Sequence, residues 1–356
     1  MSILQTHICP QCNGEFFSEG DLNPSWNGLC NYCLLHEKPK VQEVIIRPEL
    51  IDTSKLAFGE QKLLWRPESF DDYVGQEALK DILKGYIKGC KELSRPFPHF
   101  LVDGKAGTGK TTIAYILAKQ LGLTFVECVA NTVKSPQQLV DLLVQTNGGI
   151  LFLDEIQVIN KSVASFILPI LEDFQISGKA IKPFTLFGCS TEKGILLKKW
   201  KPLVDRFRIQ KTLDPYTLQE LAILTKQYKD KTFKNLNVEE SVYTSIALNC
   251  RNTPRIAIRL LESYVYMAKP LNEVYRAYNI VKNGITQDDI KMLKLLSENE
   301  KGLGLNSICA YLQTSQENFI YSMESYLIEQ GLLTIGNRRQ ITLKGKELLE
   351  GLKNGN

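Results

Sequence analysis

Residues 104–111 have the spacing G-x-x-x-x-G-K-[ST]. Glycines at these positions let the backbone curl so that successive N–H groups point inward at phosphate oxygens. The ammonium of Lys110 is then placed to reach the β- and γ-phosphates of a nucleoside triphosphate, and the hydroxyl of Thr111 to ligate Mg²⁺. The spacing therefore predicts a site for ATP and Mg²⁺, with contacts from Gly104, Gly107, Gly109, Lys110, Thr111 and Thr112.

The segments on either side of this loop fit the elements that must position it. Residues 99–102 form a short apolar run typical of a buried strand, and residues 112–120 have the pattern of a helix. The N-terminus of that helix adds the positive end of its dipole to the phosphate site. A chance match in a glycine-rich turn is the alternative, and the order strand, loop, helix argues against it.

A second motif predicts hydrolysis. Residues 150–153 are four apolar residues followed by Asp154 and Glu155. This is the form of a buried parallel strand that delivers two acids at its carboxyl end, where open α/β sheets bind their ligands. By itself it indicates no more than a strand leaving the core. Downstream of a phosphate loop, it places Asp154 to hold the Mg²⁺ shell and Glu155 to orient or deprotonate the attacking water.

Four cysteines near the start form two C-x-x-C pairs separated by 17 residues, Cys9 with Cys12 and Cys30 with Cys33. Each pair can form a tight turn whose sulfurs approach one ion, so the spacing predicts a four-cysteine Zn²⁺ site. A shell filled by four sulfurs is closed, which makes the site structural. Four unrelated thiols are the alternative, and we interpret His7 and His36 as bystanders.

Composition limits the class of protein. The chain has 356 residues, 44% of them hydrophobic and 23% charged, with a net charge of +4, as in a globular protein of two to four domains. No window approaches the ~18 apolar residues of a membrane span, and residues 1–11 lack the apolar core of a signal peptide. We therefore expect a cytoplasmic protein that does not associate with membranes.

The rest of the chain changes character in three steps. Strand and helix patterns alternate up to about residue 211, which predicts an α/β domain with a parallel sheet covered on both faces. Amphipathic helices and no convincing strand follow from 217 to about 283. Residues 287–356 then read as three helices and a hairpin, the order of a winged helix.

The hairpin of this last segment carries basic residues without acids. Between residues 331 and 346 there are two arginines and two lysines and no aspartate or glutamate. A solvated turn is the alternative reading. We predict DNA contact from Arg338, Arg339 and Lys344, because phosphate neutralisation needs such an uncompensated basic edge.

The order of these motifs resembles the RuvB family, hexameric AAA+ motors that drive branch migration of Holliday junctions. The resemblance covers residues 63–349 and rests on segments 65–76, 104–111, 154–156, 183–191, 203–207, 252–257 and 325–331. It implies an AAA+ P-loop sheet domain with a helical lid, followed by a winged helix. The predicted organisation is a zinc-binding module (1–38), a linker (39–62), the large nucleotide-binding domain (63–212), the helical lid (213–286) and the winged helix (287–356).

The resemblance also assigns roles to single residues. Thr191 matches sensor 1, Arg206 the arginine finger that reaches a neighbouring subunit's nucleotide, and Arg255 sensor 2 in the lid. For these arginines an ordinary surface salt bridge is the alternative, and for Trp65 and Tyr216 it is core packing. The catalytic set is then Lys110, Asp154, Glu155, Thr191, Arg206 and Arg255, and further nucleotide contacts are implied for Trp65, Arg66, Glu172, Asp173, Phe174 and Tyr216.

The sequence departs from the family in several places. Residues 175–182 are shorter than the β-hairpin that docks the partner RuvA in the family, which puts RuvA-type docking in doubt. Gln157 stands where the family has histidine, and Val204 where it has a second arginine. The amino-terminal cysteine module is not part of the family plan.

Our leading hypothesis is an ATP-dependent DNA motor of RuvB type that acts as a homo-oligomeric ring on DNA, with a junction-binding or loading protein as a candidate partner. One alternative is an AAA+ clamp loader or helicase loader. Clamp loaders usually carry Ser-Arg-Cys at the finger, and this tripeptide does not occur here. A second alternative is a non-catalytic zinc and winged-helix DNA-binding regulator, against which Glu155, Thr191 and Arg206 argue.

Overall fold

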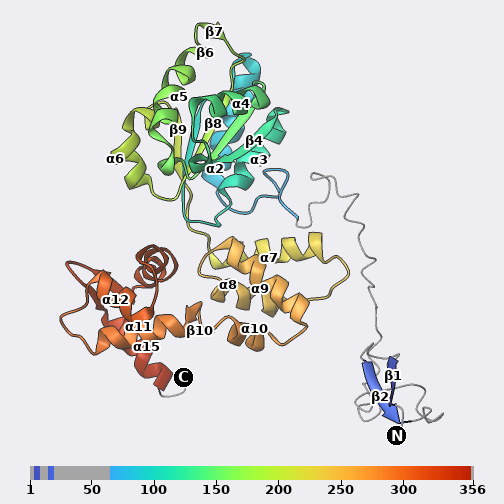
Figure 1. The fold of residues 1–356 in the computed structure, drawn as a ribbon, viewed down its shortest axis with the longest axis vertical. Coiled ribbons are helices and arrows are strands. Elements are labelled where there is room, and N and C mark those ends of the chain that lie inside the picture. Colours follow the sequence, from blue (N-terminus) through green and yellow to red (C-terminus); the bar gives the residue numbers. More distant parts are fainter. Residues whose placement is uncertain (1–3, 9–14, 20–64, 354–356) are drawn as a thin grey trace. The chain divides into compact units, whose positions relative to one another are not determined.

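The structure is a computed structural model that describes residues 65–353 and the backbone of two short strands near the N-terminus (Figure 1). The chain divides into two compact units, Met1–Lys62 and Leu63–Asn356. In the first unit β1 (Leu4–Ile8) pairs antiparallel with β2 (Glu15–Glu19). Within the described residues, no helix combines the length and apolar character needed to cross a membrane.

Five parallel strands form the central sheet of the second unit, in the order β4-β5-β8-β3-β9 (Figure 1). The inner strands β5 and β8 are buried along almost their whole length. Continuous burial is expected of parallel strands that are covered on both faces. The strands are β3 (Phe100–Asp103), β4 (Phe125–Val129), β5 (Ile150–Asp154), β8 (Thr185–Ser190) and β9 (Ile209–Thr212).

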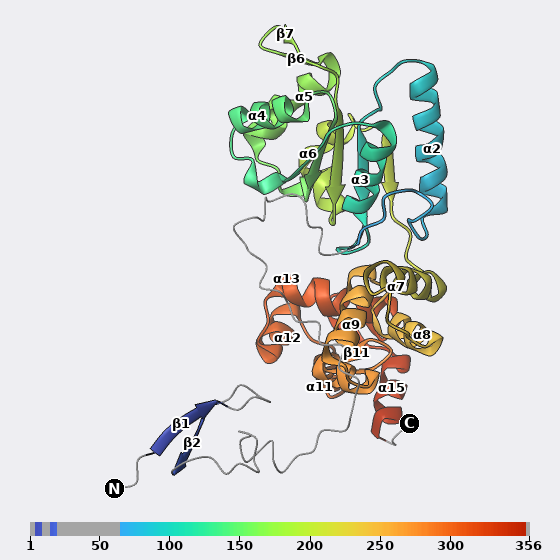
Figure 2. The ribbon, with the colours of Figure 1, turned by 90° about the vertical axis from the view of Figure 1, so that its right-hand side faces the viewer.

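Helices cover both faces of this sheet (Figure 2). On one face α2 (Glu77–Glu92) and α3 (Lys110–Leu121) contribute to a core with Phe100, Phe152 and Phe187. On the other face a second core gathers apolar side chains from three further helices. These are α4 (Pro136–Thr146), α5 (Lys161–Asp173) and α6 (Lys193–Val204).

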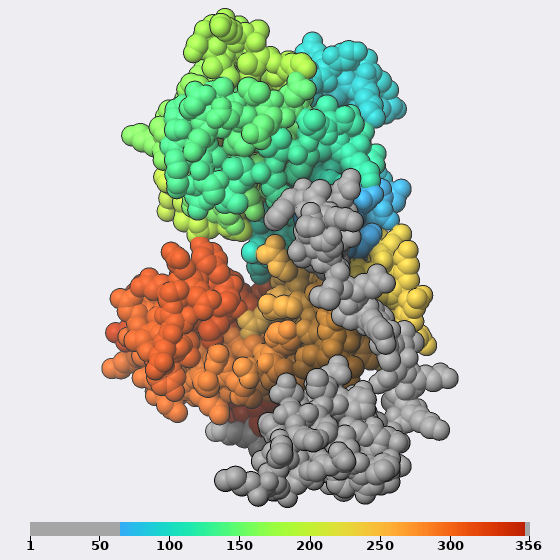
Figure 3. Space-filling model, turned by 45° about the vertical axis from the view of Figure 1, so that its right-hand side comes forward, coloured from blue at the N-terminus to red at the C-terminus, as the bar shows by residue number. Residues whose placement is uncertain are grey.

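The connection from α5 to β8 forms a very short hairpin. Strand β6 (Gln175–Ile176) pairs with β7 (Lys179–Ala180), and Ser177 and Gly178 make the turn with positive φ. In Figure 3 these yellow-green residues protrude from the rest of the sheet domain. Each strand has only two residues, so the hairpin presents little backbone for pairing with a partner.

Helices dominate the segment that follows the sheet. A core of apolar side chains joins α7 (Leu218–Thr232), α8 (Glu240–Asn249), α9 (Pro254–Met267) and α10 (Leu271–Ala277). Thr217 and Glu220 form a reciprocal capping box that fixes the start of α7. Pro254 occupies the first turn of α9, where its missing N–H costs nothing.

The last segment is a winged helix with a core of its own. Strands β12 (Leu333–Ile335) and β13 (Arg339–Ile341) form an antiparallel hairpin. Leu303 forms an isolated antiparallel bridge with Arg339 on the other side of β13. The third helical element contains a π-helical turn, η5 (Ile320–Glu324), between α13 (Gln316–Phe319) and α14 (Ser325–Glu329). The other helices are α11 (Gln287–Ser297), α12 (Leu305–Leu312) and α15 (Leu343–Lys353).

The structure confirms the predicted fold class of a P-loop parallel sheet with a carboxyl-terminal winged helix. One sequence prediction was wrong: the helical segment ends in a strand, β10 (Ile280–Lys282), which pairs with β11 (Ile285–Thr286). Strands of three and two residues are too short to show a period of two. The linker and the four cysteines predicted to bind zinc lie outside the described residues.

Candidate nucleotide site

The predicted phosphate loop connects β3 to α3. Lys110 begins α3 and is 7% exposed, and its Nζ donates hydrogen bonds to the backbone oxygens of Gly104 (2.7 Å) and Lys105 (3.1 Å). The hydroxyl of Thr108 donates to the same oxygen of Lys105 at 2.7 Å. The loop is therefore closed on itself by its own side chains. An ammonium has three N–H donors, so Lys110 retains one for a ligand.

Two glycines of the loop lie where no other residue would fit. Gly107 has φ +78° and Gly109 has φ +98°, in the left-handed region. A Cβ on Gly107 would lie 2.9 Å from Cβ of Arg255, and one on Gly109 would lie 2.6 Å from the hydroxyl of Tyr73. The bare backbone of the loop is thus pressed between side chains from two other segments. The loop therefore presents bare backbone at these two positions, as a phosphate-binding loop requires.

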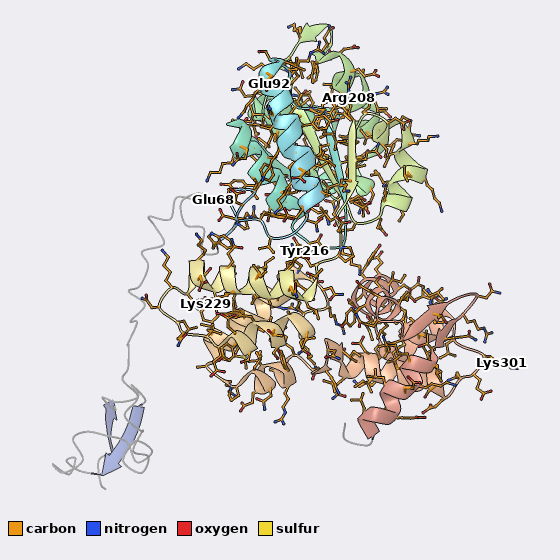
Figure 4. The ribbon with its side chains drawn as sticks, turned by 180° about the vertical axis from the view of Figure 1, so that it is seen from behind. Glu68, Glu92, Arg208, Tyr216, Lys229 and Lys301 are labelled. Carbon is orange, nitrogen blue, oxygen red and sulfur yellow. The ribbon has the colours of Figure 1, made fainter. Side chains whose placement is uncertain are left out.

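Two buried tyrosines contact the phosphate loop. The hydroxyl of Tyr216 donates to Thr108 O (3.3 Å) and contacts the hydroxyl of Tyr73 (3.3 Å). Tyr216 lies in the connection between β9 and α7 (Figure 4) and is 5% exposed. Burial raises the pKa of Tyr73 well above its ordinary value and also raises the pKa of Tyr216, so both phenols stay protonated and can donate. The predicted nucleotide residue Tyr216 therefore contacts the loop itself, and Tyr73 was missed by residue-level reasoning.

The acidic motif and Thr191 meet beside the loop. Strand β8 lies between β5 and β3, so the carboxyl ends of all three strands are adjacent. Thr191, directly after β8, donates its hydroxyl hydrogen to Oε2 of Glu155 at 2.7 Å. Asp154 ends β5, and its Oδ1 accepts the backbone N–H of Glu155 at 3.0 Å. The structure thus places Thr191 against Glu155, at the strand end next to the one that the loop of Lys110 follows, and their catalytic roles stay predictions.

Arg255 approaches the loop from the helical segment. Its backbone N–H donates to the oxygen of Gly107 at 3.4 Å, and its side chain is exposed at the start of α9. The position predicted for sensor 2 is therefore at the rim of the phosphate loop, where a guanidinium can face a bound anion.

Arg206 lies elsewhere in the sheet domain, just after α6. Its Nη2 pairs with Oε1 of Glu172 at 2.9 Å, and its Nε is buried without a partner among the described residues. Glu172 and Asp173 end α5 and are exposed. Phe174 caps that helix in the left-handed region and packs on the ring of His99. Of the stretch predicted from the family to be nucleotide-associated, Glu172 thus contacts Arg206, whereas Phe174 packs on His99.

The two remaining predicted contacts lie at the start of the described chain. Trp65 is half-buried against the helical core and meets Tyr228 edge-on, with ring centroids 6.5 Å apart. Arg66 is half-buried, and Thr111 and Thr112 are half-buried in the first turn of α3.

The basic residues of the winged helix differ in their partners and in their exposure. Arg339 forms a two-point ion pair with Glu324, with Nε to Oε1 at 2.7 Å. Arg338 donates to Gly302 O at 3.3 Å, and Lys344 donates to Gln330 O at 2.8 Å, and both side chains are exposed. DNA contact by the three stays a prediction.

A glycine-rich loop after β3, an Asp-Glu pair at the end of β5, a polar residue at the end of β8 and a helical domain behind them define an AAA+ P-loop ATPase. Comparison with known proteins then gives the family. The family described as the Holliday junction DNA helicase RuvB P-loop domain matches residues 65–213, and the RuvB C-terminal winged helix domain matches residues 282–350. The chain belongs to the RuvB family.

Individual relatives agree with this assignment. The chain is 33% identical over 310 residues to the Holliday junction branch migration complex subunit RuvB of Nitratiruptor sp., covering 80% of this chain and 91% of the relative. It is 31% identical over 311 residues to the subunit of Mycoplasmopsis pulmonis, covering 97% of it. The solved RuvB Holliday junction branch migration motor of Thermotoga maritima superposes with a TM-score of 0.71 at 31% identity, over 82% of this chain and 99% of that one.

Proposed function

We propose that this protein is an ATP-driven motor that moves the branch point of Holliday junctions. One observation carries the proposal: the loop, the acidic pair and Thr191 converge at one edge of the sheet, in a chain that ends in a RuvB-type winged helix. The convergence supplies ATP hydrolysis, and the winged helix supplies a place for duplex DNA.

The chain's own residues divide the work of hydrolysis. Mg²⁺, when bound by Thr111 and Asp154, would neutralise charge on the triphosphate. The backbone amides of the loop and the ammonium of Lys110 hold the phosphates. The carboxylate of Glu155 accepts a hydrogen bond from the attacking water and takes up its proton, while Thr191 holds that carboxylate in place.

We infer that the active form is a ring, six copies by the family resemblance. Arg206 pairs with the exposed Glu172 at an edge of the sheet domain, so it is available to a neighbouring copy. A finger acting across that boundary stabilises charge on the neighbour's phosphates. We expect an isolated subunit to hydrolyse ATP poorly.

Movement of a labelled synthetic four-way junction by the full-length protein tests the proposal. The intact chain should resolve the junction into two duplexes only with hydrolysable ATP, and Lys110→Ala should abolish both this and phosphate release. Lys119→Ala, which removes an exposed lysine from the same helix, is the matched control. ATP turnover that duplex DNA stimulates without any junction movement would favour a loader and count against the motor.

The amino-terminal module adds a second, separate proposal. From their spacing we infer that Cys9, Cys12, Cys30 and Cys33 bind one structural Zn²⁺. Metal analysis of the purified chain should give one zinc per subunit, and Cys30→Ser together with Cys33→Ser should remove it without loss of ATP turnover. Equal zinc content in the variant would contradict the site.

A further inference from the structure

Gln157 is a buried polar residue next to the acidic pair. It lies two residues after Glu155, in the short turn η4 (Ile156–Val158), and is 3% exposed. This turn packs against β8 and α6. Buried glutamines are uncommon and hold their place through hydrogen bonds.

Its amide joins a closed network with Glu155 and Thr191. Nε2 of Gln157 donates to Oε2 of Glu155 and to the hydroxyl oxygen of Thr191, the latter at 3.1 Å. Thr191 passes its own hydrogen to Oε2 of Glu155 at 2.7 Å. Every donor in the network has one acceptor, which fixes the orientation of the amide, because a flipped amide would set oxygen against oxygen.

Both donors reach the same carboxylate oxygen. Oε2 of Glu155 accepts from Gln157 and from Thr191, whereas within residues 65–353 no donor reaches Oε1. The backbone of Glu155 is in the left-handed region, with φ +51°, a strained conformation that is common at functional sites. Among the described residues, Oε1 is thereby the carboxylate oxygen that is left to accept a hydrogen bond from a ligand.

The network has a cost in the fold. Oε1 of Gln157 is buried and has no hydrogen-bond partner among the described residues. A buried unpaired carbonyl destabilises a protein, and an apolar side chain of the same shape would avoid this penalty. A residue kept only for stability would not be expected to carry it.

We propose that Gln157 is a positioning residue for ATP hydrolysis. Its amide holds one oxygen of Glu155 so that the other oxygen can accept the hydrogen of the attacking water. The inference rests on the proposed function, in which Glu155 is the residue that acts on that water.

The test is steady-state ATP turnover by the full-length protein with Gln157→Met, which keeps the length and shape of the side chain and removes the donors. We expect kcat to fall about 10- to 100-fold, with KM for ATP within about twofold. The melting temperature should stay the same or rise, because the unpaired carbonyl is gone. Gln137→Met, at an exposed position on α4, should leave all three values unchanged.

Two results would overturn the inference. One is an unchanged kcat. The other is a kcat that falls together with the melting temperature, which is the mark of a purely structural role. Gln157→Leu provides a second folded variant if the methionine does not fit.

A double variant separates this inference from the proposed function. In a Glu155→Gln background, Gln157→Met should reduce kcat by less than about twofold further, because it acts through Glu155. A full additional loss would contradict the inference. Normal turnover by Glu155→Gln alone would instead contradict the role of Glu155 in the proposed function.

Discussion

The nucleotide site and the wing of the winged helix both carry cations that the sequence assigns to phosphate, but the fold uses them differently. In the described part of the chain, the ammonium of Lys110 donates its hydrogen bonds to backbone oxygens of its own loop, partners that a phosphate can replace. Arg339 is paired with a glutamate whose side chain is 5% exposed. A cation held by carbonyls is available to a ligand, whereas one held by a buried carboxylate is part of the core.

The same contrast exists inside the sheet domain. Arg206 is also paired with a carboxylate, but Glu172 is 53% exposed and Arg206 itself 32%. A solvent-screened pair of this kind contributes little stability and exchanges readily. The comparison therefore predicts which basic residues act on phosphate and which hold the fold.

The largest effect is expected from Arg206→Ala. ATP binding should be retained and turnover should fall about 10³-fold, because an arginine finger acts on the transition state. A fluorescent ATP analogue measures binding and phosphate release measures turnover. Arg208→Ala, an exposed arginine two residues further on, is the control. If Arg206→Ala hydrolysed ATP at the normal rate, the ring proposal would fail.

A smaller effect, on the stability of the fold, is expected from Arg339→Ala. It leaves the buried Glu324 without its partner, which should lower the free energy of unfolding by about 3 kcal/mol. Arg338→Ala, at the exposed neighbouring position, should change it by less than about 0.5 kcal/mol. Urea unfolding followed by circular dichroism measures both. If both variants lowered the free energy of unfolding equally, the burial of Glu324 would not explain the contribution of Arg339.

Two exposed cations should show the opposite behaviour, Arg338 in the wing and Lys344 at the start of α15. Arg338→Ala and Lys344→Ala should each weaken DNA binding by about 1 kcal/mol and lower the salt dependence by about one counterion. Fluorescence anisotropy with a labelled duplex over a salt series measures this. Unchanged salt dependence in both variants would show that neither side chain contacts the DNA.

The smallest effect concerns pH. His99 is 7% exposed, its Nε2 faces Leu171 O, and its Nδ1 accepts the N–H of Leu186. Burial lowers the pKa of His99, so below about pH 6.5 the unfolded chain binds a proton that the folded chain does not. This contribution to stability is fully present above that pH and is lost as the pH falls towards the lowered pKa.

Melting temperatures between about pH 7.5 and 5.5 should thus decline more steeply for the intact chain than for His99→Gln. Glutamine can offer one donor and one acceptor but does not titrate. Parallel curves for the two proteins would mean that other groups cause the decline.

The sequence by itself determined the features that depend on neighbouring residues. Spacing alone located the phosphate loop, because positive φ and close neighbouring side chains leave no room for a Cβ at Gly107 and Gly109. Apolar runs followed by acids placed Asp154 at the end of a strand, since a buried parallel strand must be apolar along its length. Local periodicity likewise predicted three helices and the hairpin of the winged helix, but not α15, which follows the hairpin.

Only the tertiary structure decided which distant residues meet. The order of the strands brings β8 beside β5, and this alone joins Thr191 to Glu155 and gives Gln157 its role. The junction between α8 and α11 depends in the same way on packing, because Arg251 pairs with the fully buried Asp289. A sequence pattern predicts the local conformation of each segment. Which distant residues pair depends on which of them are buried together, because a buried charge or donor without a partner destabilises the fold.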